Sequence, residues 1–221
     1  YHPFSWRARV DFGTGALGDM GCHILDPVFW ALKVKYPVSA QSSFTLNKNM
    51  QESYPLSSVV HLDCTSRGPM PSVKIHWYDG GLLPERPEEL ESGRRLGDDK
   101  GGVLFVGDQG KLMCGYAGES PQLLPYSKMK AYKKPNKTLP RVKVRHEMDW
   151  VNAIKEGQQP SSNFDYAGPF TEMVLMGNLS LFRPGEKILW DAEKMQVTNI
   201  PELNEIVSPT YRDGWYLDKP S

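Results

Sequence analysis

The chain carries no net charge and little cysteine. Its 26 basic side chains balance 26 acidic ones, which argues against a dedicated nucleic-acid binder. The three cysteines, Cys22, Cys64 and Cys114, are scattered and form no Cys-x-x-Cys pair. An odd and scattered set argues against a full disulfide framework and against a zinc site built from thiolates. We therefore expect neither a metal site nor a disulfide scaffold.

Long apolar runs are missing as well. No stretch is apolar enough over the length of a bilayer, and no signal peptide is visible, so we expect no membrane span. The first residue is Tyr1 and not a methionine, so the absence of a visible targeting segment carries little weight. With 221 residues the chain is long enough to bury a sizeable core.

Residues 13–35 are the stretch around which the chain is organised. Glycines lead into a predicted helix with two stripes. The apolar stripe, with the three- and four-residue spacing of a helix face, comprises Leu17, Met20, Ile24, Val28 and Ala31 or Leu32. The polar stripe, on a different face, comprises Asp19, His23, Asp26 and Trp30. Residues four apart lie one above the other, which stacks a carboxylate and an imidazole near the start of the helix.

The pairing of Asp19 with His23 has a chemical use. Histidine titrates near neutrality, and a neighbouring carboxylate fixes its tautomer and favours its protonated form. A general base that removes a hydroxyl proton needs these properties. Glycines at 13, 15, 18 and 21 leave room for a ligand or another backbone. The alternative, which residue types alone leave equally open, is a helix-surface pair of little consequence.

Two features next to this pair admit two readings each. Pro27 either kinks one long helix or stands in the first turn of a second helix capped by Asp26. The lead-in over residues 1–12 is either a surface loop packed by Trp6 or one wall of a ligand pocket. In the pocket reading, Arg7 offers a planar set of hydrogen-bond donors.

Strand patterns dominate the middle of the chain. We predict strands over Val38–Asn47, Ser57–Ser66 and Ser72–Asp79. In the second strand Val60, Leu62 and Cys64 alternate with Val59, His61, Asp63 and Thr65, and in the third Val73, Ile75 and Trp77 alternate with Lys74, His76 and Tyr78. A hairpin follows, with strands over Gly102–Val106 and Lys111–Tyr116 and a turn over residues 107–110.

The long loops carry charge. Residues 84–100 form either a solvated loop or a lid over a site. Residues 117–140 are predicted as a long irregular excursion. From Lys128 to Arg145 there are eight basic residues and no acidic one. This basic segment is either a solvated loop or a means of attracting an anionic substrate.

Helices return near the end. One is predicted from His146 to Glu156 and stops at Gly157. A second, Ala167–Phe182, is densely apolar and must be buried, and its Glu172 needs a partner. A short strand over Lys187–Trp190 precedes an irregular tail. Because strands come in consecutive runs and do not alternate with helices, we predict an α+β fold: a large, mostly antiparallel, open-faced sheet with helices on one face.

The glycine run Gly13-Thr-Gly-Ala-Leu-Gly18 matches Gly-x-Gly-x-x-Gly by letter. No apolar strand precedes it, and no acidic residue follows on a strand about 20 residues on, so we reject it as a dinucleotide fingerprint.

The signature over residues 13–26 nevertheless resembles a known family. Its Gly-x-Gly-Ala-Leu-x-Asp-x-Gly-x-His-x-x-Asp pattern is similar to the second-domain signature of the glucose–fructose oxidoreductase and inositol dehydrogenase-like (Gfo/Idh/MocA) family, and the wider run from Trp6 to His23 to a subgroup associated with Bacteroidetes and planctomycetes. Further similar segments span nearly the whole chain: residues 107–110, 146–150, 163–165, 172–178 and 211–215.

The resemblance implies that residues 1–221 are one α+β domain for substrate binding and oligomerisation, the C-terminal domain of a two-domain oxidoreductase. The cofactor, NAD or NADP, would be bound mainly by an N-terminal Rossmann domain absent from this chain, so no cofactor-binding residue is assigned. The resemblance places His23 and Asp19 on the family's catalytic pair. With the pocket reading of residues 1–12, Trp6 and Arg7 are expected to bind substrate. The fragment alone is expected to be inactive.

Three functions follow from this resemblance. The first is hydride transfer between a sugar, cyclitol or glycoside and the nicotinamide, with His23 taking the hydroxyl proton. The second is a glycoside lyase or hydrolase that oxidises the sugar only transiently. It would cleave glycosides without net NADH. The third is a non-catalytic carbohydrate-binding or assembly domain, which would not need Asp19 and His23 at this spacing.

Partners and compartment also follow from the resemblance. Besides a small carbohydrate-like substrate and the Rossmann domain, we expect a homo-oligomer formed through the sheet face. No nucleic acid is expected. The sequence does not decide between the periplasm and the cytoplasm of a bacterium as the compartment.

Overall fold

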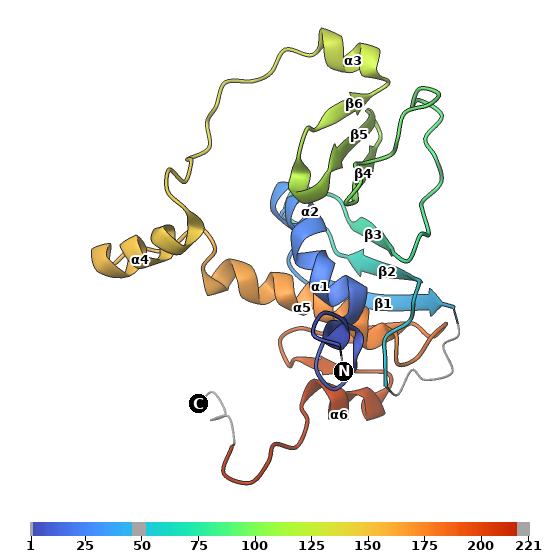
Figure 1. Cartoon of the computed structure of the whole chain (residues 1–221), viewed down its shortest axis with the longest axis vertical. Helices are drawn as coiled ribbons and strands as arrows, with labels where there is room; N and C mark the ends of the chain where they lie inside the picture. Colours follow the sequence, from blue (N-terminus) through green and yellow to red (C-terminus); the bar gives the residue numbers. More distant parts are fainter. Residues whose placement is uncertain (1, 46–51, 216–221) are drawn as a thin grey trace. The chain divides into compact units, whose positions relative to one another are not determined.

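The computed structural model describes residues 2–45 and 52–215 and has an α+β fold (Figure 1). The described part contains six α-helices and two antiparallel sheets, one of five strands and one of three. The chain divides into two compact units. The first comprises residues up to Gly21, residues 34–84 and residues from Met173 onward. The second comprises residues 22–33 and 85–172. One domain over 1–221 stays a prediction.

The first unit is built on the five-stranded sheet, in which every neighbouring pair is antiparallel. In spatial order its strands are β3 (Val73–Tyr78), β2 (Ser58–Cys64), β1 (Pro37–Phe44), β7 (Ile188–Asp191) and β8 (Gln196–Val197). The four predicted strands are thus confirmed, although Asn47, the predicted end of the first, lies outside the described residues. The sequence did not indicate that β7 joins β1.

The predicted alternation along β2 and β3 is confirmed. Val60 and Leu62 are almost completely buried, whereas His61 and Asp63 are half-buried. In β3, Ile75 and Trp77 are buried and Lys74 and His76 are exposed. Since successive side chains of a strand point to opposite faces, one face of this sheet belongs to the core and the other meets solvent.

Parts of two helices cover the buried face. Helix α1 (Gly15–Ile24) contributes Leu17, and the end of α5 (Phe164–Ser180) contributes Gly177. A methyl group on Gly177 would lie 2.5 Å from Leu17 Cδ2 and 3.4 Å from Val60 Cγ1. The small residue therefore lets α5, α1 and β2 approach closely.

The single helix expected over residues 13–35 does not form. Helix α1 ends at Ile24, and α2 (Asp26–Ala31), which belongs to the second unit, follows with Pro27 in its first turn. The two-helix reading is therefore correct, because proline fits a first turn and breaks a helix interior. Leu25, not Asp26, occupies the N-cap position, and no side chain caps this helix.

Helix α5 begins earlier than predicted. Asn163 precedes its first residue, and the Asn163 side chain accepts a hydrogen bond from the Tyr166 amide at 3.2 Å, which is an N-cap. From Met173 onward the helix is buried as expected, except that Leu175 is exposed.

The tail was predicted to be irregular, and this is wrong up to Val207. Strand β8, the 3₁₀ helix η3 (Pro201–Leu203) and α6 (Asn204–Val207) are ordered there. Asn204 hydrogen bonds through its side chain to both the amide and the carbonyl of Val197. In this region a small hydrophobic core is formed by Leu179, Ile188, Val197 and Leu203.

The second unit holds the three-stranded sheet. The predicted hairpin is confirmed as β4 (Gly102–Gly107) and β5 (Gly110–Gly115), and β6 (Gln122–Leu124) pairs with β5. The predicted excursion over 117–140 is therefore partly wrong: 3₁₀ helix η2 (Tyr116–Gly118), β6 and α3 (Tyr126–Ala131) interrupt it. Leu90, Met113 and Leu124 form the core of this sheet.

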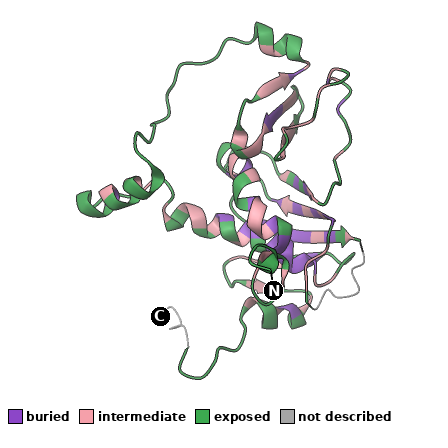
Figure 2. Ribbon diagram, in the orientation of Figure 1, coloured by how far each residue is buried: buried purple, intermediate pink, exposed green. Residues whose placement is uncertain are grey.

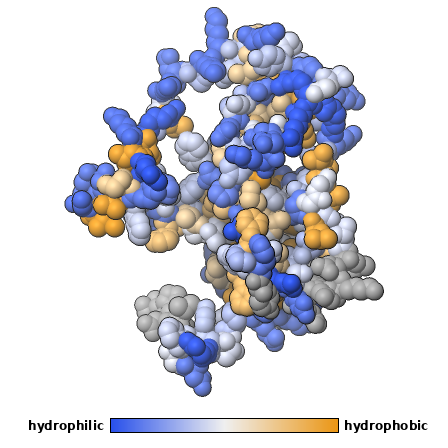
Figure 3. Space-filling view, viewed as in Figure 1, coloured by the Kyte–Doolittle hydropathy of each residue, from blue (hydrophilic) through white to orange (hydrophobic). Residues whose placement is uncertain are grey.

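Helix α4 (His146–Glu156) ends as predicted, because Gly157 adopts the left-handed conformation with φ 64°. Most of its residues are exposed (Figure 2). Among them are the apolar Met148, Trp150, Val151 and Ile154, and Figure 3 shows hydrophobic surface along this helix. Among the described helices, none is both long and apolar enough to cross a membrane.

Candidate functional site

Glycines at the start of α1 allow other segments of the same chain to lie close to the backbone. A methyl group on Gly13 would meet the Arg7 backbone at 2.2 Å. Gly15 has φ +65°, and a methyl group there would lie 2.6 Å from Tyr54 Cγ. Of the two uses predicted for these glycines, close approach by another part of the protein is the one seen at Gly13 and Gly15.

Arg7 pairs with Asp19 in the first unit. Arg7 lies on the 3₁₀ helix η1 (Ser5–Ala8), and its Nη1 is 3.5 Å from Asp19 Oδ2. The guanidinium also stands 4.4 Å from the Phe4 ring centroid and 5.6 Å from that of Trp6. Cations are attracted to ring faces at such distances. The structure thus brings together three residues predicted for the site, Trp6, Arg7 and Asp19.

Two buried polar atoms of this unit are unsatisfied. Arg7 Nε and Asn178 Oδ1 have no hydrogen-bond partner among the described residues. Asn178, on α5, donates from Nδ2 to the Thr14 carbonyl at 2.6 Å, just before α1 begins. An unpaired buried polar atom costs about 1–3 kcal/mol. Asn178 was not predicted as a site residue, because only tertiary structure brings it to the start of α1.

His23 lies in the second unit and is exposed. Its ring stands 5.4 Å from the Tyr116 ring, with 35° between the planes. The Tyr116 amide donates to Asp98 Oδ2 at 2.7 Å, and Lys100 Nζ lies 5.6 Å from the Tyr116 ring centroid. Backbone amides of Lys100, Tyr116 and Gly101 lower the pKa of Asp98. The imidazole is therefore reachable from solvent, and its aromatic neighbour was not predicted.

Asp19 and His23 both lie on α1, four residues apart. This is the helical spacing that the sequence predicted. The proposed orientation of His23 by Asp19 stays a prediction.

Asp26, the next member of the polar stripe, has a structural partner. Tyr166 Oη donates to Asp26 Oδ1 at 2.5 Å. Burial, together with the negative charge of Asp26, raises the pKa of Tyr166. Phe29 packs edge-on against the Tyr166 ring. This contact ties α2 to α5 within the second unit. Trp30 is exposed.

The charged loop over 84–100 is tied to its own unit. Arg86 donates to the carbonyls of Leu90, Glu91 and Arg94. Glu89 pairs with Lys111 of β5 at 2.7 Å. A lid role is untested. In the basic segment, residues 130–145 are all exposed, which agrees with a solvated loop, and attraction of a substrate is likewise untested.

The cysteines are free thiols, and two of them are buried. Burial raises the pKa of the Cys64 thiol to about 11 and also raises that of Cys114. Neither is suited to nucleophilic chemistry at neutral pH. In residues 2–45 and 52–215, no group of three or more His, Cys, Asp or Glu side chains is placed to hold a metal ion.

Comparison with known proteins adds no assignment: no protein-family model matches this chain, and no curated protein matches it significantly.

Proposed function

We propose that this chain is the substrate-binding and catalytic half of a nicotinamide-dependent oxidoreductase of the Gfo/Idh/MocA type, acting on a sugar, cyclitol or glycoside. One observation carries the proposal. A glycine-rich helix presents an exposed imidazole, His23, one turn after the carboxylate of Asp19. The α+β fold with its open five-stranded antiparallel sheet agrees with the sheet domain that this family uses.

In this proposal His23 is the general base. It takes the proton from a substrate hydroxyl while hydride leaves the same carbon, so that a carbonyl forms. A positioned base of this kind is worth about 10²–10⁴ in rate. Asp19 holds the imidazole in the tautomer that accepts the proton.

The glycine run of this chain does not fit a dinucleotide. It follows η1 and not a strand, and the space beside Gly13 and Gly15 is filled by Arg7 and Tyr54. Dinucleotide phosphates need a strand, a glycine turn and a helix N-terminus in that order. We therefore assign the hydride acceptor, NAD or NADP, to an upstream Rossmann domain.

For substrate binding we propose Arg7 and Trp6. The Arg7 side chain is about one-third exposed, so it offers a guanidinium donor to a ligand, and the Trp6 side chain is 43% exposed. A hydroxyl-rich substrate supplies acceptors for the donor and apolar C–H faces for the ring. A second copy of the protein is the proposed partner for the solvent face of the five-stranded sheet.

The test uses the full-length enzyme with its upstream domain. We expect His23→Ala to lower kcat/KM for NADH formation by about 10² or more. His146→Ala, at an exposed histidine of α4, should leave it unchanged. Asp19→Asn should lower kcat less and shift the acidic limb of the pH profile. Unchanged turnover in His23→Ala removes this residue from the mechanism.

A further inference from the structure

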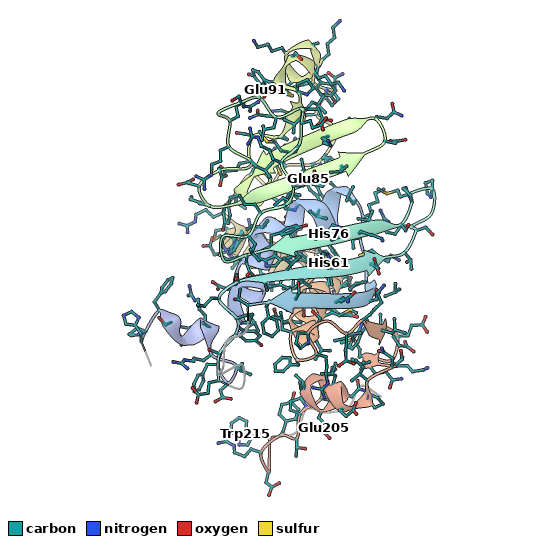
Figure 4. The ribbon with its side chains drawn as sticks, turned by 90° about the vertical axis from the view of Figure 1, so that its right-hand side faces the viewer. His61, His76, Glu85, Glu91, Glu205 and Trp215 are labelled. Carbon is teal, nitrogen blue, oxygen red and sulfur yellow. The ribbon has the colours of Figure 1, made fainter. Side chains whose placement is uncertain are left out.

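Two histidines face each other across neighbouring strands of the first unit. His61 of β2 and His76 of β3 are directly opposite in the antiparallel register. Their ring centroids are 4.7 Å apart, with 76° between the planes, and the two Nδ1 atoms are in contact. Figure 4 labels both side chains on these adjacent strands. Side chains at directly opposed positions of an antiparallel pair have Cβ atoms about 4.5–5.5 Å apart.

The pair belongs to the solvent face of the sheet. His76 is exposed and His61 is half-buried, whereas the next opposed pair, Leu62 and Ile75, is buried. Hydrophobic packing therefore fixes the backbones that carry the imidazoles and leaves the ring edges open to solvent. The strand backbones that carry the two rings are therefore placed opposite one another before any ligand arrives, and the rings need only turn apart for both nitrogens to reach one ion.

Two converging Nδ1 atoms allow two kinds of chemistry. They can share one proton, with one ring as donor and the other as acceptor. Alternatively, both can use their lone pairs on one cation, since neutral imidazole is a ligand for zinc, nickel and copper. We propose that His61 and His76 together bind one divalent transition-metal ion of this group.

The surroundings fit a two-nitrogen site with open coordination positions. Asp63, on the same face of β2, has its Oδ2 atom engaged by Lys187 Nζ at 2.7 Å and by Ser39 Oγ at 2.8 Å, so that oxygen already serves an ion pair and a hydrogen bond. Water, or a group from the second copy proposed for this sheet face, would fill the remaining positions.

The surroundings of His76 favour the ligating form of its ring. Burial, with His61 and Lys74 nearby, lowers the pKa of His76, while Asp63 acts in the opposite direction. Metal binding requires the neutral ring, and a lowered pKa favours that form of His76. Lowering the pH through the histidine range should release the metal. The inference does not rest on the proposed oxidoreductase activity.

The experiment is calorimetric titration of the untagged, chelator-treated full-length protein with ZnCl₂, NiCl₂, CuCl₂ and MgCl₂ at pH 7.5. We expect one equivalent of Zn²⁺, Ni²⁺ or Cu²⁺ to bind, with Cu²⁺ the tightest. Magnesium should not bind, because it prefers oxygen ligands. His61→Ala and His76→Ala should each weaken binding by about tenfold or more, since two ligands become one. The matched control His146→Ala should bind as the wild type does.

A second measurement guards against misfolding of the variants. Circular dichroism must show native melting for His61→Ala and His76→Ala, and otherwise His61→Gln and His76→Gln replace them. The electron paramagnetic resonance spectrum of the Cu²⁺ form should show two nitrogen ligands in the wild type and fewer in each variant. No binding by the wild type, or binding that survives both substitutions, overturns the proposal. So does a wild-type spectrum with fewer than two nitrogens.

Discussion

Arg7 Nη1 lies 3.5 Å from Asp19 Oδ2, so the carboxylate proposed to orient the general base also neutralises the arginine proposed to bind substrate. Both side chains are about one-third exposed, and exposed pairs of this kind contribute about 0–1 kcal/mol to stability. The pair therefore matters more for placing a guanidinium than for holding the fold.

Replacement of Arg7 should show this directly. Under the proposed function, we expect Arg7→Ala in the full-length protein to raise KM for its substrate by about tenfold and to lower the free energy of unfolding by no more than about 1 kcal/mol. Arg7→Lys should restore little, because an ammonium cannot reproduce the planar donor set. Steady-state kinetics and urea unfolding measure the two effects. Arg9→Ala, which removes an arginine paired with Glu52, is the control, and an equal rise in KM there would contradict the role of Arg7.

Gly15 should tolerate no side chain. Its φ of +65° disfavours any other residue, and a methyl group would meet the Tyr54 ring at 2.6 Å. We expect Gly15→Ala to destabilise the first unit by about 1–3 kcal/mol. Gly107→Ala is the matched control, because its methyl group would find only the Gly110 carbonyl oxygen at 3.6 Å. Thermal melts of both variants would refute this view if they were equal.

Asp79 connects the end of β3 to the start of β2 through side-chain hydrogen bonds. Its carboxylate accepts hydrogen bonds from the Ser58 amide at 2.6 Å, the Ser58 hydroxyl at 2.8 Å and the buried Trp77 indole at 2.7 Å. We expect Asp79→Ala to cost about 2–3 kcal/mol, since hydrogen bonds to a charged group are the stronger kind and the indole loses its acceptor. Denaturant unfolding followed by tryptophan fluorescence measures this. The exposed Asp99→Ala should be neutral, and a neutral Asp79→Ala would show that water replaces the carboxylate.

Acid should weaken the second unit through Glu91. Its own backbone amide, the Tyr126 amide and Arg94 lower the pKa of Glu91 from 4.5 to about 2. The unfolded chain therefore binds the proton first, and stability falls as the pH drops from about 4.5 to about 2. We expect Glu91→Gln to be less stable at pH 7 and to lose less stability across this window. Hydrogen exchange of amides in β4–β6 at several pH values tests this. The exposed Glu88→Gln should keep the wild-type dependence.

Local patterns predicted much of the fold. The alternation in β2 and β3, the hairpin of β4 and β5, and the glycine stop at Gly157 are properties of neighbouring residues, so the sequence displays them. The pairing of β1 with β7 joins residues far apart in the chain, and no short-range signal carries it. Strand β8 has two residues, too few for a period, and its order comes from Asn204 and from the core around Leu203.

The candidate site, like the fold, was predictable from the sequence only where it depends on residues that are close in the chain. The spacing of Asp19 and His23 is a helical repeat and could be read directly. Their neighbours Arg7 and Tyr116 could not be assigned to them, because those contacts depend on tertiary structure. His61 and His76 could each be placed on the outward face of a strand, but only the register sets them opposite one another.

The order β3-β2-β1-β7-β8 has a consequence for biosynthesis. Strands β1 to β3 leave the ribosome early, whereas β7 follows only after the entire second sheet and helices α3, α4 and α5. At about 5–20 residues per second, β1 presents an unpaired edge for several seconds or longer on every nascent chain. Until β7 is made, that edge is open to pairing with another chain, so the order of synthesis leaves an aggregation-prone surface that the finished sheet covers.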